Sequence, residues 1–208
     1  AVVVVGGGDV GGDVVVVGTN DVPTIDATSA VLAELSNETG SNTHDAASGT
    51  ITFTDVDLTD RPVASAAFTS FTFEPAVNNL ANSLTAAQLA AIAAVQAPLT
   101  VTQAGGNANN GSASWSYSVP DSAFDFLAEG EVLTLTYTAT DDDGHGGGVT
   151  KPLTITVTGS NDAIEVTSGE QTAAIVEIAG AHGSDQADTA SGSITFADAD
   201  LTDTHEVT

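Results

Sequence analysis

The chain has 208 residues, of which 28 are acidic and only 2, Arg61 and Lys151, are basic, so its formal net charge is −26 at pH 7. This charge excludes nucleic acid and anionic membrane surfaces as partners and favours cations. The sequence contains no cysteine and no unbroken apolar run of membrane-spanning length, so we expect neither disulfides nor membrane insertion.

The composition predicts an all-β fold. Apolar residues make up 41% of the chain, enough for a packed core, and the strand-favouring Thr, Val, Ile and Phe are interrupted by many glycines. Residues 1–18 contain only Ala, Val, Gly and Asp, and they predict a strand, a glycine-rich turn and a second strand.

A long part of the sequence occurs twice. Residues 18–25 return as residues 159–166, and residues 33–60 return as residues 176–203. One repeat is therefore about 140 residues long, the usual size of a domain. We predict three units: the C-terminal strands of a preceding repeat (1–20), a complete repeat (21–162) and the N-terminal strands of a following repeat (163–208). Either a slice of a longer array or a subunit that borrows strands would give this pattern.

Two segments of the complete repeat alternate with period 2 and end in carboxylates. One face of each segment is apolar and then becomes acidic. These faces consist of Ile51, Phe53, Asp55 and Asp57 in the first segment and of Leu133, Leu135, Tyr137, Ala139 and Asp141 in the second. Because the apolar members face the interior of a sandwich, we expect Asp55, Asp57 and Asp141 to emerge at one pole if both strands run the same way.

Only residues 83–98 have helical spacing. Four apolar residues would lie on one side of this helix, and Pro98 would end it. These apolar residues are Leu84, Leu89, Ile92 and Val95. A turn of helix is expected again around residues 120–131, and residues 62–112 read as a long insertion.

The acidic residues need a positive partner that the chain hardly supplies. Two carboxylates about 4 Å apart repel by roughly 1 kcal/mol in water and by more where the dielectric is lower. Calcium accepts about six to eight oxygen ligands in flexible geometry, whereas zinc prefers nitrogen and sulfur. Asp, Asn and Gly also form ordinary solvated turns, which is the alternative. Because charge, repetition and position at strand ends agree, the sequence favours Ca²⁺ sites.

Several motifs occur in the order of the calcium motifs of cadherin-like domains. They are VLAELS (31–36), FTDVDLTD (53–60), FDFLAEGE (124–131), LTYTATDDDGHGG (135–147) and ITVTGSND (155–162). Residues 112–163 resemble more closely the VCBS repeats of very large bacterial surface proteins, and the resemblance covers nearly all of residues 19–162 and both flanks. It implies cadherin-like (Ig-like) β-sandwich repeats in tandem, an extracellular location at the bacterial cell surface, export by a type I route, and a role in adhesion or biofilm.

The resemblance further implies that calcium lies between repeats. At the first junction the expected ligands are Asn20, Asp21, Asp55, Asp57 and Asp141. At the second junction they are Glu34, Asp125, Glu131, Asn161, Asp162, Asp198 and Asp200. Further carboxylates in reserve are Asp60, Asp142, Asp143 and Asp203. The linkers GTNDVP and GSNDAI depart from the cadherin linker, so fewer ions per junction are compatible with this sequence.

These features favour a calcium-stiffened spacer or adhesive repeat of a large extracellular surface protein or filament. Its expected partners are neighbouring repeats of the same chain or identical subunits, with surface glycans or matrix as further partners. The alternatives are a carbohydrate- or protein-binding module that uses residues 62–112, and a filament subunit assembled by strand complementation.

For Trp115 and Tyr117 we expect core packing rather than a sugar platform. We expect no enzyme, because the histidines lie in Gly- or Asp-rich loops and no nucleophile elbow is present.

Overall fold

The computed structural model describes residues 17–76, 84–177, 179–180, 182–183 and 185–206. Residues 1–16, for which we expect a strand, a turn and a second strand, lie outside the described residues. The helices and strands, in chain order, are β1 (Thr24–Ala27), β2 (Ala30–Ala33), β3 (His44–Thr54), β4 (Val63–Glu74), α1 (Ala86–Ala94), β5 (Thr100–Gln103), β6 (Asn110–Pro120), the 3₁₀ turn η1 (Asp121–Ala123), β7 (Val132–Asp142), β8 (Val149–Thr158), β9 (Glu165–Val166) and β10 (Phe196–Ala197).

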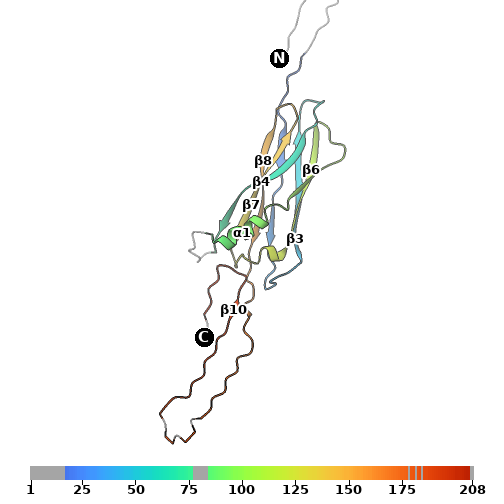
Figure 1. Cartoon of the computed structure of the whole chain (residues 1–208). Coiled ribbons are helices and arrows are strands. Elements are labelled where there is room, and N and C mark those ends of the chain that lie inside the picture. Colours follow the sequence, from blue (N-terminus) through green and yellow to red (C-terminus); the bar gives the residue numbers. More distant parts are fainter. Residues whose placement is uncertain (1–16, 77–83, 178, 181, 184, 207–208) are drawn as a thin grey trace, which may run out of the picture.

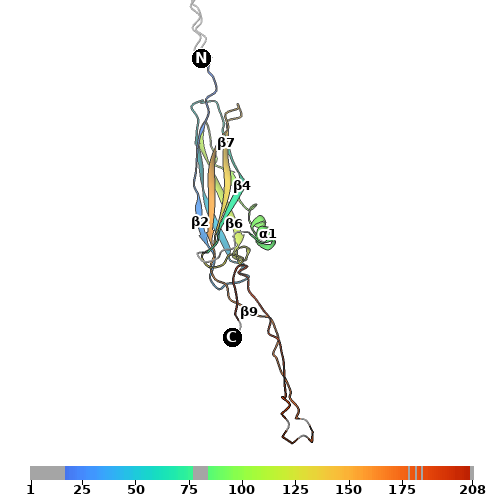
Figure 2. The ribbon, with the colours of Figure 1, turned by 90° about the vertical axis from the view of Figure 1, so that its left-hand side faces the viewer.

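Two four-stranded sheets pack face to face, which confirms the predicted β-sandwich (Figures 1 and 2). One sheet has the order β1-β3-β6-β5 with antiparallel neighbours, and the other has the order β2-β8-β7-β4, in which β2 and β8 run parallel. The strands follow the long axis of the molecule, so their ends gather at two poles. We call the pole at which the N-terminal linker enters the upper pole and the opposite one the lower pole.

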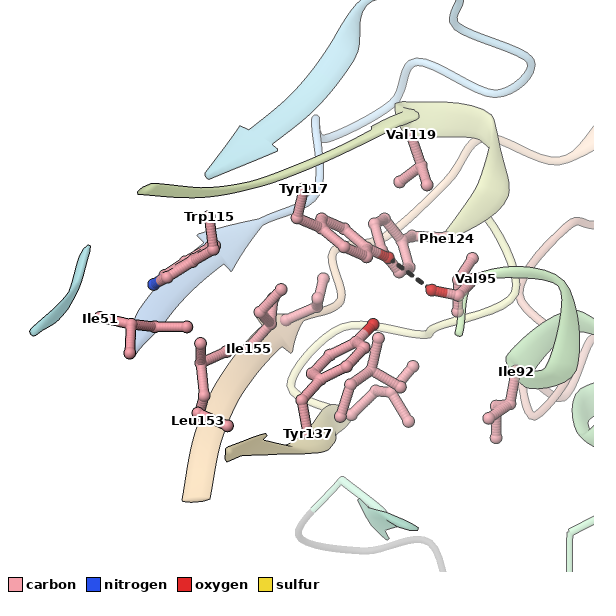
Figure 3. Close-up of a cluster of buried hydrophobic side chains, with 14 of the residues drawn as sticks. Ile51, Ile92, Val95, Trp115, Tyr117, Val119, Phe124, Tyr137, Leu153 and Ile155 are labelled. Atoms are coloured by element: carbon pink, nitrogen blue, oxygen red, sulfur yellow. Dashed lines mark hydrogen bonds between the residues drawn. The ribbon is translucent and has the colours of Figure 1, made fainter. Parts of the chain in front are cut away.

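The core lies between the sheets, on the faces that the alternation predicts. Ile51 and Phe53 of β3 are at most 1% exposed, as are the predicted inward-facing residues of β7. Trp115 and Tyr117 of β6 are also buried, which confirms core packing for both (Figure 3). At about 25 cal/mol per Å² of buried apolar surface, these aromatic side chains are large contributors to the stability of the sandwich.

The reading of residues 62–112 as a long insertion is wrong. β4 pairs with β7 along its whole length, and β5 pairs with β6, so most of this segment belongs to the two sheets. The alternation of Ala64, Ala66 and Phe68 would have predicted a strand here. This pattern was missed because two of its three inward residues are small alanines.

The predicted helix over residues 83–98 forms as the shorter α1. Thr85 caps it by accepting a hydrogen bond from the backbone N–H of Gln88 (3.2 Å). Tyr117 donates a hydrogen bond to the carbonyl oxygen of Val95 (3.0 Å), which fixes the end of the helix against the core (Figure 3). Leu89, expected on the buried side, is 46% exposed, because Gln88 and Ile92 are the buried residues of the helix. In the described part of the chain no helix is long and apolar enough to cross a membrane.

The described residues after 162 (163–177, 179–180, 182–183 and 185–206) leave the lower pole as an extended hairpin (Figure 1). In this hairpin, β9 and β10 pair Val166 with Phe196. The corresponding residues of the complete repeat, Ile25 and Phe53, pair in the same way between β1 and β3. The pairing register of β1 and β3 thus recurs in the hairpin. The predicted domain boundaries remain a prediction.

Candidate metal centre

The upper pole is built on an acid loop, residues 55–60, which follows β3 directly. Asp57 donates its backbone N–H to Oδ1 of Asp55 (2.9 Å), and Asp60 donates its own to the carbonyl oxygen of Asp57 (3.0 Å). These bonds fold the loop tightly, so that Asp55 and Asp60 are each only 4% exposed. The loop therefore directs carboxylates inward at the end of a core strand.

Two further segments bring polar groups to the acid loop. Asp141, near the end of β7, and Asp143, just beyond it, are both buried. From the linker, Asn20 donates its side-chain N–H to Oδ2 of Asp143 (2.9 Å), and Asp21 donates its backbone N–H to Oδ2 of Asp57 (2.6 Å). All five residues predicted for the first junction thus lie at one pole, although Asp21 contacts the acid loop through its backbone.

The carboxylates of the upper pole form a compact group of oxygen donors. One oxygen each from Asp55, Asp60 and Asp143 lies within 4.8 Å of the others. Both oxygens of Asp141 are buried and have no hydrogen-bond partner among the described residues. Burial, followed by the charges of Asp55 and Asp143, raises the pKa of Asp141 to about 6.

No lysine or arginine compensates this group. Arg61 donates hydrogen bonds to the carbonyl oxygens of Leu58 and Asp60, and Lys151 lies 3.5 Å from Asp26. Nδ1 of His145 lies 3.4 Å from a carboxylate oxygen of the acid loop, Oδ2 of Asp60. His145 is largely exposed, so this imidazole does not fill the buried space between the carboxylates.

The lower pole holds a second group, the base cluster, made of Glu34, Asp125 and Asp162. One oxygen from each lies within 4.8 Å of the others. Glu34 accepts a backbone hydrogen bond from Ser160 (2.9 Å) through Oε2, while its buried Oε1 has no hydrogen-bond partner. Burial raises the pKa of Glu34 to about 9, and the charge of Asp162 adds to this. Burial also raises the pKa of Asp162.

A second acid loop, residues 198–203, lies against the base cluster and has the same geometry as the first. Asp200 donates its backbone N–H to Oδ1 of Asp198 (3.1 Å), and Asp203 donates its own to the carbonyl oxygen of Asp200 (3.2 Å). Asp162 donates its backbone N–H to Oδ2 of Asp200 (2.8 Å), as Asp21 does to Asp57 at the upper pole. Each of these contacts in the hairpin therefore repeats a contact of the complete sandwich.

The predicted residues of the second junction also lie together at the lower pole. Some of them form hydrogen bonds, and others belong to the groups of carboxylate oxygens. Glu131 is fully buried and accepts hydrogen bonds from the backbone N–H of Ala128 (3.2 Å) and the hydroxyl of Thr202 (2.8 Å), which lies in the second acid loop. Asn161 donates its side-chain N–H to the carbonyl oxygen of Asp162 (2.6 Å). Asp198, Asp200 and Asp203 form the third group of oxygens within 4.8 Å of one another.

Five carboxylates were undervalued or missed. Of those named only as reserves, Asp60 and Asp143 belong to the upper group and Asp203 to the third group, whereas Asp142 is exposed. Asp45 and Asp121 were not named, yet Asp121 is fully buried. Period-2 alternation would have found both, since Asp45 precedes and Asp121 follows the apolar side of a core strand.

The donor set fits a hard divalent cation. Its members are carboxylate oxygens, which calcium prefers, and several buried carboxylate oxygens in each group have no hydrogen-bond partner in the described structure. Buried charges of one sign are costly unless they are paired or coordinate a metal. The arrangement can therefore bind cations where two segments of the chain meet.

Comparisons with known proteins give limited similarity. No family model matches the chain, and no curated protein matches its sequence. Among solved structures, PapD-like domain 7 of human CEP192 has a TM-score of 0.38 at 8% identity, with 69% of this chain and 88% of that chain covered. AggA, the major subunit of aggregative adherence fimbriae type I from Escherichia coli, has a TM-score of 0.38 at 12% identity, with 68% of this chain and 97% of that chain covered. These values are too low to transfer a function.

Proposed function

We propose that the chain is an extracellular spacer or adhesive module in which calcium stiffens the junctions between successive sandwich units. One observation carries this proposal. The acid loop, with its inward carboxylates and its contact to a linker Asn-Asp, occurs twice with the same hydrogen bonds, once at each pole. A solvated turn would have no physical reason to repeat buried carboxylates that lack hydrogen-bond partners.

The lower junction indicates how a cation would act mechanically. The second acid loop contacts the sandwich through Thr202 and Glu131 and through Asp200 and Asp162. The base cluster and the second acid loop approach one another there with carboxylates of one sign, so without a cation they repel. A calcium ion bound to oxygens of both would replace this repulsion by shared ligation. At about a hundredfold excess over its dissociation constant, each ion would stabilise the junction by roughly 2.7 kcal/mol.

The hairpin residues 163–206 expose the counterparts of core residues. Ile194 and Phe196, which correspond to Ile51 and Phe53, are 61% and 38% exposed. Their burial requires further strands, which fits either a neighbouring repeat of the same chain or an identical subunit that completes the sandwich. With either partner, the chain would act as one module of an array.

The alternative of a glycan- or protein-binding module has less support. Its proposed binding segment, residues 62–112, largely forms strands of the two sheets. Trp115 and Tyr117, the aromatic residues weighed as a sugar platform, are 0% and 1% exposed. We therefore retain the spacer as the proposed function.

Small-angle X-ray scattering in calcium and in chelator tests this proposal. We expect chelation to increase flexibility and change the radius of gyration of the wild type, because the hairpin would lose its cation-mediated contact with the lower pole. An Asp198→Asn, Asp200→Asn double variant should have the same dimensions in both conditions. An Asp185→Asn, Asp188→Asn double variant, with the same charge change at exposed hairpin positions, should behave like wild type. Unchanged wild-type dimensions after chelation would contradict the proposal.

A further inference from the structure

A pair of carboxylates outside the three groups lies deeper in the lower pole. Asp45 stands at the start of the core-facing side of β3, opposite Val119 of β6. Asp121 follows Val119 by two residues and continues the core-facing side of β6. The two acids are thus diagonal neighbours, one on β3 and one directly after the end of β6, at the point where the apolar core ends.

Both carboxylates are only partly satisfied. Asp121 is 0% exposed, and its Oδ1 accepts the backbone N–H of Leu35 (2.9 Å). Its Oδ2 and the Oδ2 of Asp45 are buried and have no hydrogen-bond donor among the described residues. The carboxyl groups are close enough to hydrogen-bond if one were protonated, and burial, followed by the charge of Asp121, raises the pKa of Asp45 to about 6.

Among the described residues, no ion pair joins Asp45 or Asp121 to a lysine, arginine or histidine. Arg61 is bonded to backbone carbonyls of the acid loop at the opposite pole, and Lys151 lies beside Asp26. His44 is adjacent to Asp45 in sequence, but its Nδ1 contacts the hydroxyl of Ser118 (2.7 Å), on the other face of β3. The pair therefore needs a proton or a cation from solution.

The surroundings favour a cation. Asp121 accepts the backbone N–H of Leu35, the residue that follows Glu34, so it lies beside the base cluster as well as beside Asp45. A region with this many carboxylates attracts divalent cations. Asp45 also has a counterpart in the second copy of the sequence, Asp188, which precedes the same Ala-Ser-Gly segment after one residue.

We propose that Asp45 and Asp121 hold a calcium ion of their own inside the lower pole, within one sandwich and separate from the ions at the junctions. The inference shares with the proposed function the premise that the chain binds calcium, but it does not require a second unit. Calcium suits the pair because its ligands are carboxylate oxygens and its flexible geometry allows backbone carbonyls or water to complete the shell.

Calcium titration calorimetry and native mass spectrometry of the full chain test this site. We expect Asp45→Asn to bind one calcium ion fewer than wild type. Asp188→Asn is the matched control, since Asp188 has the same local sequence but is exposed, and it should keep the full number of ions. Asp121→Asn is a second variant, whose amide oxygen can still accept the Leu35 N–H, and it should also lose one ion.

Thermal melting distinguishes a calcium ion bound by the pair from a proton shared between the two carboxylates. If calcium occupies the pair, Asp45→Asn should melt higher than wild type in chelator, because the repulsion is gone, and should lose this advantage in saturating calcium. An equal advantage in both conditions, with the ion count unchanged, would mean that the pair holds a proton and would overturn the inference.

The inference and the proposed function fail separately. If Asp198→Asn, Asp200→Asn loses an ion while Asp45→Asn and Asp121→Asn keep all of theirs, the inner site is wrong and the junction site stands. If Asp45→Asn loses an ion but chelation leaves the scattering of wild type unchanged, the inner site stands and the stiffened junction is wrong. A wild type that binds no calcium would overturn both.

Discussion

Replacing Asp141 by Asn should have opposite effects on stability with and without calcium. Asp141 is buried at the upper pole, and neither of its oxygens has a hydrogen-bond partner in the described structure. In chelator its charge only repels Asp55 and Asp143, so removing it should stabilise the fold. In calcium the same charge is an expected ligand, so removing it should weaken the binding that stabilises the folded state.

The size of the effect follows from the pKa of Asp141. Raising this pKa from 3.8 to about 6 corresponds to roughly 3 kcal/mol at most for the ionised form. Solvent screening at the pole reduces the expected gain of Asp141→Asn in chelator to about 1–2 kcal/mol at pH 7. For a chain of this size, that gain raises the melting temperature by about 2–8 °C.

The sign of the pH dependence is also fixed. Below the unfolded-state pKa of 3.8, both states hold the proton and Asp141 carries no penalty. As the pH rises through the window from 3.8 to about 6, the unfolded state loses its proton first, so stability falls, and the loss is complete above the folded-state pKa. In chelator, this contribution should therefore make wild type less stable at pH 7.5 than at pH 5, and Asp141→Asn should show a smaller decrease.

The assay is thermal melting in chelator and in millimolar calcium, with Asp142→Asn as control. Asp142 is the next residue on β7 but is exposed, and its side chain accepts a hydrogen bond from Gly144, which an Asn can also accept. Because the charge of Asp142 makes the smallest contribution to the raised pKa of Asp141, the control should stay closer to wild type than Asp141→Asn in both conditions. Equal melting temperatures of Asp141→Asn and wild type in chelator would refute the claim that Asp141 is an uncompensated buried charge.

Three further predictions concern the sandwich itself and are checked by urea unfolding. Leu133→Ala should cost about 2–5 kcal/mol because Leu133 is fully buried, whereas Val31→Ala, at a side chain 77% exposed, should stay within about 0.5 kcal/mol; similar costs would contradict the assigned core. Tyr117→Phe should cost about 1–3 kcal/mol, because the buried carbonyl oxygen of Val95 loses its donor, and a neutral result would mean that α1 is not fixed by this bond. Gly159→Ala should cost about 1–3 kcal/mol, because its Cβ would lie 2.4 Å from the backbone oxygen of Leu127, and unchanged stability would show that the lower pole can move apart.

Alternation predicted the strands that carry long apolar side chains. Long apolar residues alternate at Ile51 and Phe53 of β3 and at Leu133, Leu135 and Tyr137 of β7, and these residues are buried as expected. The carboxylates at the upper ends of these faces meet because both strands run toward the same pole. The sequence alone did not predict this shared direction. The pKa of Asp141 responds to the charge of Asp55, so the two ends are close.

The same reasoning failed where small residues or tertiary contacts decide the structure. β4 begins with Ala64 and Ala66 at its inward positions, a weak signal that made a sheet strand look like an insertion. Leu89 is the most apolar residue on its turn of α1, yet the side of the helix that faces the sandwich is set by Tyr117 and Tyr137, whose hydroxyls bind the carbonyl oxygens of residues 95 and 96. Single-sequence periodicity contains no information on these contacts.

The inward faces of the core strands give a physical reason for the proposed dependence of this fold on ions from solution. On β3 the inward positions run from Asp45 through Ile51 and Phe53 to Asp55, so a carboxylate stands at each end of one apolar row. The row on β6 passes likewise into Asp121. Packing the apolar part of each row therefore draws its acids into the poles, since all members lie on one face of a strand. If the poles bind cations as proposed, folding and neutralisation of the poles occur together, and we expect the concentration of available cation to set the stability of the sandwich.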